Sequence, residues 1–250
     1  MAGEGGRALF YTEDGRPVPA VTAGQMREVD RIAVEEFGLG LLQMMENAGR
    51  NLAGNALEML GGEGRATVLA GAGGNGGGGL CCARHLHNRG LKVDLVLDRQ
   101  EAALGKAARA QLETLRAAGL APVLSDGTAE AIGRADLVVD ALIGYSLRGA
   151  PRGRAGELIA LCNERAARVL ALDLPSGLDA TNGRAPGGVV RAERTLTLAL
   201  PKTGLATAAE AVAGELFLAD IGIPPEVYGR LGLAAGAIFG AHYWLRLVPG

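Results

Sequence analysis

The sequence predicts an α/β protein in which helices cover both faces of a mostly parallel sheet. Short, almost continuous apolar runs, typical of strands buried on both faces, recur between residues 66 and 222. Stretches rich in Ala, Leu and Arg separate the first four runs and have the period of a helix. The 250 residues are 48% hydrophobic and 21% charged, which fits a chain with a large core and excludes a disordered or collagen-like protein.

The predicted elements follow one another in a simple order. Residues 1–21 are polar and interrupted by Gly and Pro, and they predict an N-terminal arm. One helix is expected from the cap residue Thr22 to Gly38, and a second over LLQMMENAGRNLAGNALEML. The runs expected to form strands are residues 66–71, 92–98, 135–144, 168–177, 195–201 and 215–222. Neither a linker nor an internal repeat interrupts this order, so residues 22–250 predict a single domain.

Charge and cysteine content restrict the partners and the compartment. The 25 basic and 27 acidic residues leave a net charge of −2, so nucleic acid is not an expected partner. Cys81, Cys82 and Cys162 are odd in number and lack metal-ligand spacing, which predicts free thiols in a reducing compartment. His85 and His87 are two residues apart and predict no ligand pair. Without a signal-like N-terminus or a spanning segment, the expected location is cytoplasmic and no membrane contact is expected.

A glycine-rich segment follows the first strand of the predicted parallel sheet. The segment GAGGNGGGGL starts at Gly71 and leads into a helix. A turn of this kind presents backbone N–H groups and the positive end of a helix dipole to a phosphate. Asp98, 22 residues after Gly76, stands where dinucleotide-binding folds place a ribose-binding acid. The alternative is a tight turn in a chain that contains 40 glycines.

Two later strands end in polar clusters. Asp140 ends one strand and precedes the loop GYSLRGA, and the segment ALDLPSGLDATNG places Asp173, Ser176 and Asp179 after the next. The carboxyl ends of parallel strands meet at one sheet edge, where ligands bind in open α/β sheets. Carboxylates and a hydroxyl at this edge suit cation binding or general acid–base catalysis, and two Asp residues that only cap turns are the alternative.

Six ordered motifs give the chain a specific resemblance. MREVDRIAVEEFG with MMENAGR, GAGGNGGGGLCCARHL, DALIGYSLRGAPRG, DLPSGLDATNG and LALPKTG together resemble the YjeF N-terminal family of NAD(P)H-hydrate epimerases. The resemblance covers residues 22–224 and implies a Rossmann-like three-layer α/β/α sandwich. It also implies that the chain interconverts the R and S forms of hydrated NADH and NADPH (NADHX and NADPHX), which a separate dehydratase then repairs. The sequence leaves open whether the chain forms a homodimer.

The resemblance also assigns roles to individual residues. It implies Asp173 and Lys202 as catalytic residues and a potassium ion held by Asn75, Asp140 and Ser176. The substrate-binding residues that it implies, in addition to Asp173, form two loops, namely Gly74, Asn75, Gly76, Gly77 and Gly78, and then Gly144, Tyr145, Ser146, Leu147, Arg148, Gly149 and Ala150.

The first of these loops departs from the family pattern at two positions. Gly74 stands where the family has Asn, and Gly78 where it has Asp. The loss of an amide and a carboxylate removes hydrogen-bond partners but leaves the backbone cradle in place. A catalytically weak or inactive nucleotide-binding module of the same fold is therefore the alternative to an epimerase. An ordinary dehydrogenase or methyltransferase is a third interpretation, which requires a substrate domain for which the chain has no room.

Overall fold

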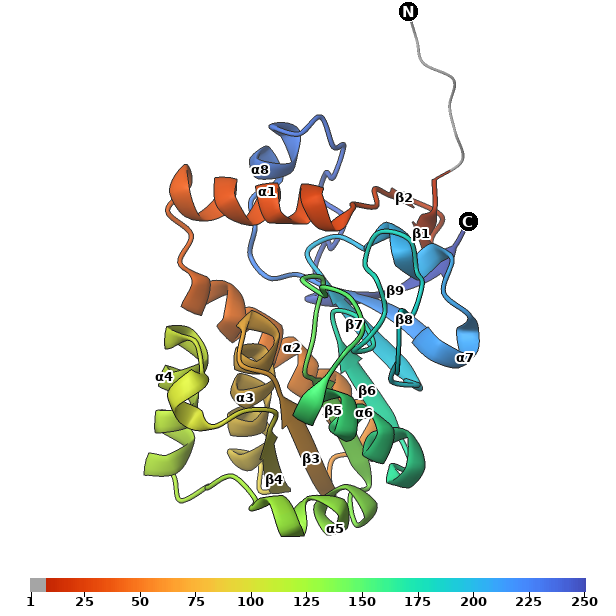
Figure 1. Cartoon of the computed structure of the whole chain (residues 1–250). Helices are drawn as coiled ribbons and strands as arrows, with labels where there is room; N and C mark the ends of the chain where they lie inside the picture. Colours follow the sequence, from red (N-terminus) through yellow and green to blue (C-terminus); the bar gives the residue numbers. More distant parts are fainter. Residues whose placement is uncertain (1–7) are drawn as a thin grey trace, which may run out of the picture.

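A computed structural model describes residues 8–250 and contains a nine-stranded sheet (Figure 1). The strand order is β2-β1-β9-β8-β7-β6-β5-β3-β4. The six strands from β4 to β8 in this order are parallel. The remaining pairs are antiparallel, namely β8 with β9, β9 with β1, and β1 with β2. The predicted fold class, a mostly parallel sheet in a three-layer α/β/α arrangement, is confirmed.

The strands and helices have the following bounds. The strands are β1 (Phe10–Thr12), β2 (Pro17–Val18), β3 (Arg65–Ala70), β4 (Lys92–Leu97), β5 (Leu137–Ala141), β6 (Val169–Leu172), β7 (Arg194–Leu198), β8 (Glu215–Ala219) and β9 (Trp244–Pro249). The helices are α1 (Ala23–Glu35), α2 (Leu41–Leu60), α3 (Gly74–His87), α4 (Lys106–Ala117), α5 (Thr128–Gly133), α6 (Gly153–Arg165), α7 (Glu210–Ala213) and α8 (Pro225–Gly229). All six predicted strands are present, and each begins within two residues of its expected start, but several end earlier than expected, β6 at Leu172 and not at residue 177.

Helices cover both faces of the parallel strands. Helices α2, α3 and α4 lie on one face (Figure 1). There Leu52, Leu80 and Leu112 share a buried cluster with strand residues such as Val68. Helices α5 and α6 cover the other face, where Leu69, the next residue of β3, belongs to a separate cluster. Successive side chains of a strand point to opposite faces, so a strand buried on both sides needs apolar residues throughout. This requirement explains the uninterrupted apolar runs of the sequence.

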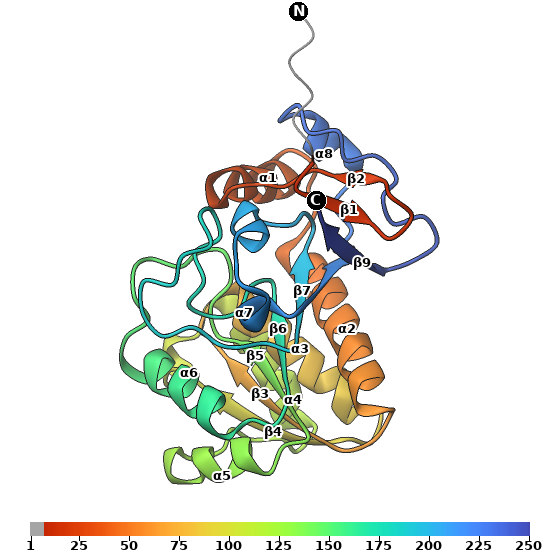
Figure 2. The same ribbon diagram turned by 90° about the vertical axis from the view of Figure 1, so that its right-hand side faces the viewer.

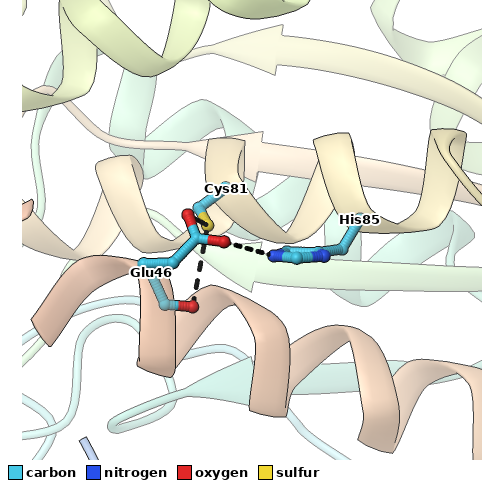
Figure 3. A group of neighbouring side chains, drawn as sticks. All are labelled: Glu46, Cys81 and His85. Atoms are coloured by element: carbon cyan, nitrogen blue, oxygen red, sulfur yellow. Dashed lines mark hydrogen bonds and ion pairs between the residues drawn. The ribbon is translucent and has the colours of Figure 1, made fainter. Parts of the chain in front are cut away.

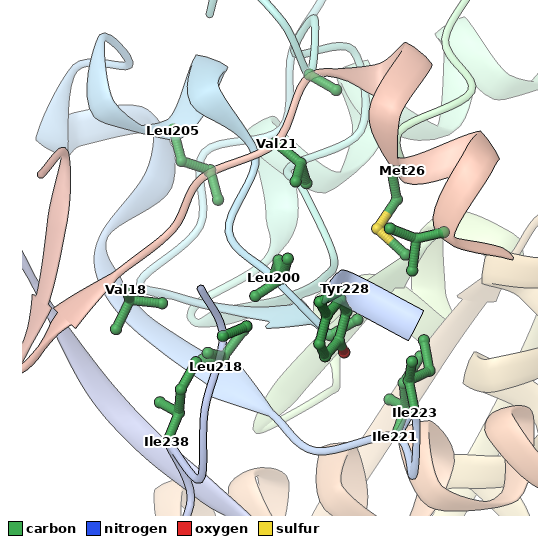
Figure 4. Close-up of a cluster of buried hydrophobic side chains, with 14 of the residues drawn as sticks. Val18, Val21, Met26, Leu200, Leu205, Leu218, Ile221, Ile223, Tyr228 and Ile238 are labelled. Atoms are coloured by element: carbon green, nitrogen blue, oxygen red, sulfur yellow. The ribbon is translucent and has the colours of Figure 1, made fainter. Parts of the chain in front are cut away.

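A third apolar cluster closes one end of the sheet. It contains Met26 of α1 and Tyr228 of α8, together with side chains from both ends of the chain (Figure 4). Helix α1 begins as predicted at Thr22, whose hydroxyl accepts a hydrogen bond from Gln25 N at 3.2 Å, while Gln25 Oε1 accepts one from Thr22 N at 2.9 Å. This reciprocal cap fixes the start of a helix that later contributes to the site.

The predicted N-terminal arm differs from the structure. Residues 1–7 of that arm lie outside the described residues. Within the rest, β1 pairs with both β2 and the C-terminal strand β9, so strands from opposite ends of the described residues lie side by side (Figure 2). Phe10 and Val18 are fully buried. The segment shows no periodicity because these strands have only three and two residues, too few for a pattern to emerge.

The strand order also fixes where a ligand can bind. Strand β3 lies between β4 and β5, so the chain crosses first to one side of β3 and then to the other. Loops that leave β3 and β5 at their carboxyl ends therefore diverge and open a crevice. Among the described residues, no helix is long and apolar enough to cross a membrane.

Candidate functional site

A cavity of about 310 Å³ lies at the carboxyl ends of the parallel strands. Its wall combines residues from loops after β3, β5, β6 and β7 with side chains of α1 and α2. The lining residues are Met26, Asp30, Leu41, Met44, Met45, Ala48, Gly74, Asn75, Gly78, Gly144, Tyr145, Ser146, Leu172, Asp173, Leu198, Lys202 and Ile221. The position agrees with the crevice that the strand order creates.

The glycine-rich segment forms the first turn of α3 and the loop before it. A Cβ atom at Gly71 would lie 2.0 Å from Leu142 O, and one at Gly76 would lie 1.7 Å from Gly71 O, so both positions require glycine. Gly74 has open space within 4 Å, and a Cβ atom at Gly78 would meet only the Leu172 side chain, at 2.9 Å. Part of this glycine run is therefore required by close backbone packing, and Gly74 is not.

Asp140 and Ser176 form a fully buried pair behind the cavity. The Ser176 hydroxyl donates to Asp140 Oδ1 at 2.6 Å, and Ser176 N donates to Asp140 Oδ2 at 2.7 Å. Burial raises the pKa of Asp140 to about 6, against the opposing effect of these hydrogen bonds. In the described part of the chain, no Lys, Arg or His forms an ion pair with Asp140. The site thus holds a buried carboxylate without a cationic partner.

Asn75 lies at the start of α3, beside Gly144 of the second loop. A Cβ atom at Gly144 would lie 3.0 Å from Asn75 Oδ1. The preceding residue, Ile143, donates a backbone hydrogen bond to Ser176 Oγ at 2.8 Å. Asn75 Nδ2 is buried and has no hydrogen-bond partner among the described residues. A buried amide without a partner is costly, so this side chain is suited to a ligand that the protein itself does not provide.

Asp173 and Lys202 form a buried ion pair in the cavity wall. Lys202 Nζ lies 2.5 Å from Asp173 Oδ1 and 2.8 Å from Leu198 O, and the two side chains are 1% and 4% exposed. Asp173 Oδ2 accepts a hydrogen bond from Tyr145 N at 3.0 Å. Asp173 directly follows β6 with φ of 69°, a left-handed conformation that Asp tolerates better than most residues. The turn therefore aims a carboxylate into the cavity at some cost in backbone strain.

Asp30 of α1 is a cavity residue that the sequence analysis missed. The Tyr145 hydroxyl donates a hydrogen bond to Asp30 Oδ2, and burial raises the pKa of Asp30. The pKa of Tyr145 is also raised, by burial and by the charge of Asp30. One signal was present in the sequence, because Asp30 lies four residues after Met26 and three before Ala33 on the buried face of α1. A carboxylate on an apolar helix face indicates a polar partner elsewhere in the fold.

The structure places the predicted site residues in three groups. Those in the cavity wall are Gly74, Asn75, Gly78, Gly144, Tyr145, Ser146, Asp173 and Lys202. Asp140, Ser176, Gly76 and Gly77 are buried behind the wall. Leu147–Ala150 continue the second loop beyond the wall, and Arg148 and Gly149 are exposed there. Asp98, the ribose-binding candidate, directly follows the edge strand β4 and does not line this cavity.

These features define a class of protein, namely an α/β protein with a glycine-rich loop and a buried carboxylate–ammonium pair at the switch point of its sheet. Residues 41–204 match the model of the family described as YjeF-related protein N-terminus. The chain belongs to this family, and the resemblance drawn from its motifs is confirmed.

Curated relatives span most of the chain. A protein named NAD(P)H-hydrate epimerase from Dehalogenimonas lykanthroporepellens is 52% identical over 95% of this chain and 96% of its own length. One of the same name from Rhodopirellula baltica is 36% identical over 84% of this chain and 87% of its own. A bifunctional NAD(P)H-hydrate repair enzyme from Hyperthermus butylicus is 40% identical over 87% of this chain, which matches 42% of that protein.

A solved structure agrees with the fold. The crystal structure of the yeast protein ynu0 superposes with a TM-score of 0.81 over 92% of this chain and 100% of the other, at 21% sequence identity. At this identity the agreement concerns the fold alone.

Proposed function

We propose that this chain is an NAD(P)H-hydrate epimerase that interconverts the R and S forms of hydrated NADH and NADPH. The observation that carries the proposal is the buried pair of Asp173 and Lys202 in the cavity wall, because it places a proton donor and acceptor beside a space for one ring. The relatives that cover nearly the whole chain and bear the same name support it.

The reaction needs proton transfer and no redox step. The hydroxyl at C6 of the substrate ring is next to N1, whose lone pair assists the departure of the hydroxyl. Asp173, with Lys202 as its proton-sharing partner 2.5 Å away, protonates the hydroxyl, which leaves as water. Water then adds to the other face of the planar cation and returns a proton to the same pair. General acid–base catalysis of this kind contributes about 10²–10⁴-fold to a rate.

The backbone and α1 position the substrate for this step. The cavity of about 310 Å³ suits the nicotinamide end of the dinucleotide. The first N–H groups of α3, starting at Gly74, have no partner within the helix, and Gly74 and Asn75 of this turn line the cavity. They are suited to bind the pyrophosphate. Tyr145 lies between Asp30 and Asp173, holding the second loop against both walls.

Residues in and behind the cavity wall offer ligands for a potassium ion. Asp140, Ser176 and Asn75 would hold it through a carboxylate, a hydroxyl and an amide oxygen, the donor types that hard cations prefer. The ion would neutralise the buried Asp140 carboxylate, and rotation of the Asn75 amide by 180° would exchange its unpartnered nitrogen for oxygen. When bound, the ion would supply electrostatic stabilisation to the loops that carry Gly144 and Asp173.

The other expectations concern the surroundings of the enzyme. Cys81, Cys82 and Cys162 are buried free thiols, which supports the prediction of a reducing, cytoplasmic compartment. The bifunctional relatives support a link to the rest of NAD(P)H-hydrate repair, with a separate dehydratase acting on the epimer that this chain supplies. A homodimer stays a prediction.

The direct test is to follow the two epimers over time. Hydrated NADH enriched in one epimer is incubated with the chain in potassium buffer, and the epimers are separated by chromatography. We expect equilibration far faster than in buffer alone, without consumption of a nucleotide triphosphate or a redox partner. Dinucleotide binding without faster equilibration would instead support the weak-module alternative, for which the absent side chains at Gly74 and Gly78 are the motivation.

A further inference from the structure

A second polar cluster lies outside the cavity, between α2 and α3. Cys81 and His85 are four residues apart and share one face of α3, and Glu46 faces them from α2 (Figure 3). Glu46 Oε1 lies 2.8 Å from His85 Nε2, and Glu46 Oε2 lies 3.3 Å from Cys81 Sγ. One ligand-type atom of each residue lies within 4.8 Å of the other two.

We propose that Glu46, Cys81 and His85 form a binding site for a thiophilic divalent cation such as Zn²⁺. Zinc binds sulfur, imidazole nitrogen and carboxylate oxygen at about 2.0–2.3 Å, so ligand atoms of a tetrahedral site are roughly 3.5 Å apart. The separations in the cluster lie on either side of this value, at 2.8 and 3.3 Å for the two contacts of Glu46 and within 4.8 Å for the third, so side-chain rotations can complete the site. A water molecule occupies the fourth position.

The surroundings of the cluster suit such an ion. Cys81 is fully buried, whereas the side chains of His85 and Glu46 are 12% and 43% exposed, which leaves a path from solvent. A Cβ atom at Gly49 of α2 would lie 2.5 Å from Cys81 Sγ. Because Gly49 has no side chain, the Cys81 sulfur has room to lie against α2 and to contact Glu46.

Metal binding replaces protons and displaces one cation. In the metal-free protein the Cys81 thiol donates a hydrogen bond to Glu46, and Arg84 binds the same carboxylate and lies 3.4 Å from Sγ. On binding, the thiol proton goes to solvent, Nε2 of His85 binds with its proton on Nδ1, and the Arg84 side chain swings outward. Arg84 therefore competes with the ion for Glu46.

Sequence spacing by itself predicts no metal site at this cluster. The cysteines lack the spacing of metal ligands, and His85 and His87 are two residues apart and form no ligand pair. The ligands come from a mixed Cys–His pair one helical turn apart and from a second helix, 35 residues before Cys81. Only the packing of α2 on α3 brings them together.

The test is a titration of the reduced, metal-free protein with Zn²⁺ by calorimetry and with Co²⁺ by absorption spectroscopy. We expect one equivalent of Zn²⁺ and a thiolate-to-cobalt absorption band in the near ultraviolet. Loss of an outer-shell partner weakens metal binding by about 10–100-fold. Cys81→Ala and His85→Gln each remove a direct ligand and should weaken Zn²⁺ binding by more than this. Arg84→Gln should bind Zn²⁺ more tightly than the unaltered chain.

Two variants outside the cluster serve as matched controls. His87→Gln and Cys162→Ala change a neighbouring histidine and a distant buried thiol, and both should bind as the unaltered chain does. The proposal is overturned if unaltered protein shows no thiolate–cobalt band, if Cys81→Ala binds Zn²⁺ unchanged, or if only His87→Gln loses binding. Should Cys81→Ala fold poorly, the cobalt spectrum and Arg84→Gln still decide. These readouts measure binding and are independent of epimerisation.

Discussion

The two ends of the parallel sheet carry the same kinds of ion pair in different surroundings. At the amino end, Arg134 binds Asp94 at 2.9 Å with side chains 43% and 13% exposed. At the carboxyl end, Lys202 binds Asp173 at 2.5 Å with side chains 1% and 4% exposed. An exposed pair contributes little to stability, and a buried pair costs several kcal/mol of desolvation per ion. The buried pair is therefore explained by chemistry at the site and not by stability.

Backbone conformation shows the same difference. Residues with positive φ other than glycine are Asp173 and Ala199 within residues 8–250, and both lie at the carboxyl end, after β6 and β7. The amino end, where strands start at Arg65 and Arg194, has no such residue among those described. Strain and buried charge thus occur together around the cavity, as expected where a fold holds reactive groups in position.

The largest effect is expected for Asp173→Asn, in the buried ion pair at the carboxyl end. An amide cannot transfer the proton, so we expect epimerisation to fall by about 10²–10⁴-fold. The change also leaves Lys202 buried without a counter-charge, which should lower the free energy of unfolding by about 3–5 kcal/mol. Chromatography of the epimers and urea unfolding measure the two effects. Asp173→Asn combined with Lys202→Met should recover stability but not activity, and an active double variant would remove the pair from the mechanism.

A second prediction concerns the glycine-rich loop at the carboxyl end. Gly74 has open space and φ outside the left-handed region, so Gly74→Asn adds the family's amide without a backbone penalty. If the amide binds the substrate, turnover should rise about tenfold, since about 1.4 kcal/mol corresponds to that factor. Gly78→Asp should add less, because Leu172 must move first. Gly133→Asn, at an open position on α5, is the control and should leave turnover unchanged. Unchanged turnover in Gly74→Asn would show that the loop needs no amide at this position.

A third prediction concerns Asp140 and pH. Because the native pKa is raised from 3.8 to about 6, the native state binds the extra proton, so without a bound cation stability should fall as pH rises from about 4 to 6. Potassium should remove much of this fall, since an ion bound only by the native state stabilises it. Melting curves in potassium and in tetramethylammonium test this. Asp140→Asn should melt alike in both salts, and identical curves for the unaltered chain would count against a bound ion.

The smallest effect is expected at the amino end of the sheet. Arg134→Ala removes exposed ion pairs with Asp94 and Glu130, and unfolding free energy should change by less than about 1 kcal/mol. Epimerisation should stay at the unaltered rate. A loss of activity in this variant would contradict the division of the sheet into a functional and a structural end.

Local sequence patterns are enough to predict the parallel core and the sheet edge at which the site lies. Strands buried on both faces have uninterrupted apolar runs, and residues such as Asp140 and Asp173 directly follow such runs, so they had to reach the same sheet edge. The antiparallel strands β1, β2 and β9 were missed because they are short or join the two ends of the chain.

Contacts between segments that are distant in the sequence could not be predicted and depend on how the helices and loops pack. Asp30 meets Tyr145 across 115 residues, and Glu46 meets His85 across 39, because α1 and α2 pack against loops and a helix formed much later in the chain. Local periodicity records which face of a helix is buried, but not what lies opposite that face. The pairing of Lys202 with Asp173, on which the proposed chemistry depends, has the same origin, since two different strand ends hold the two charges together.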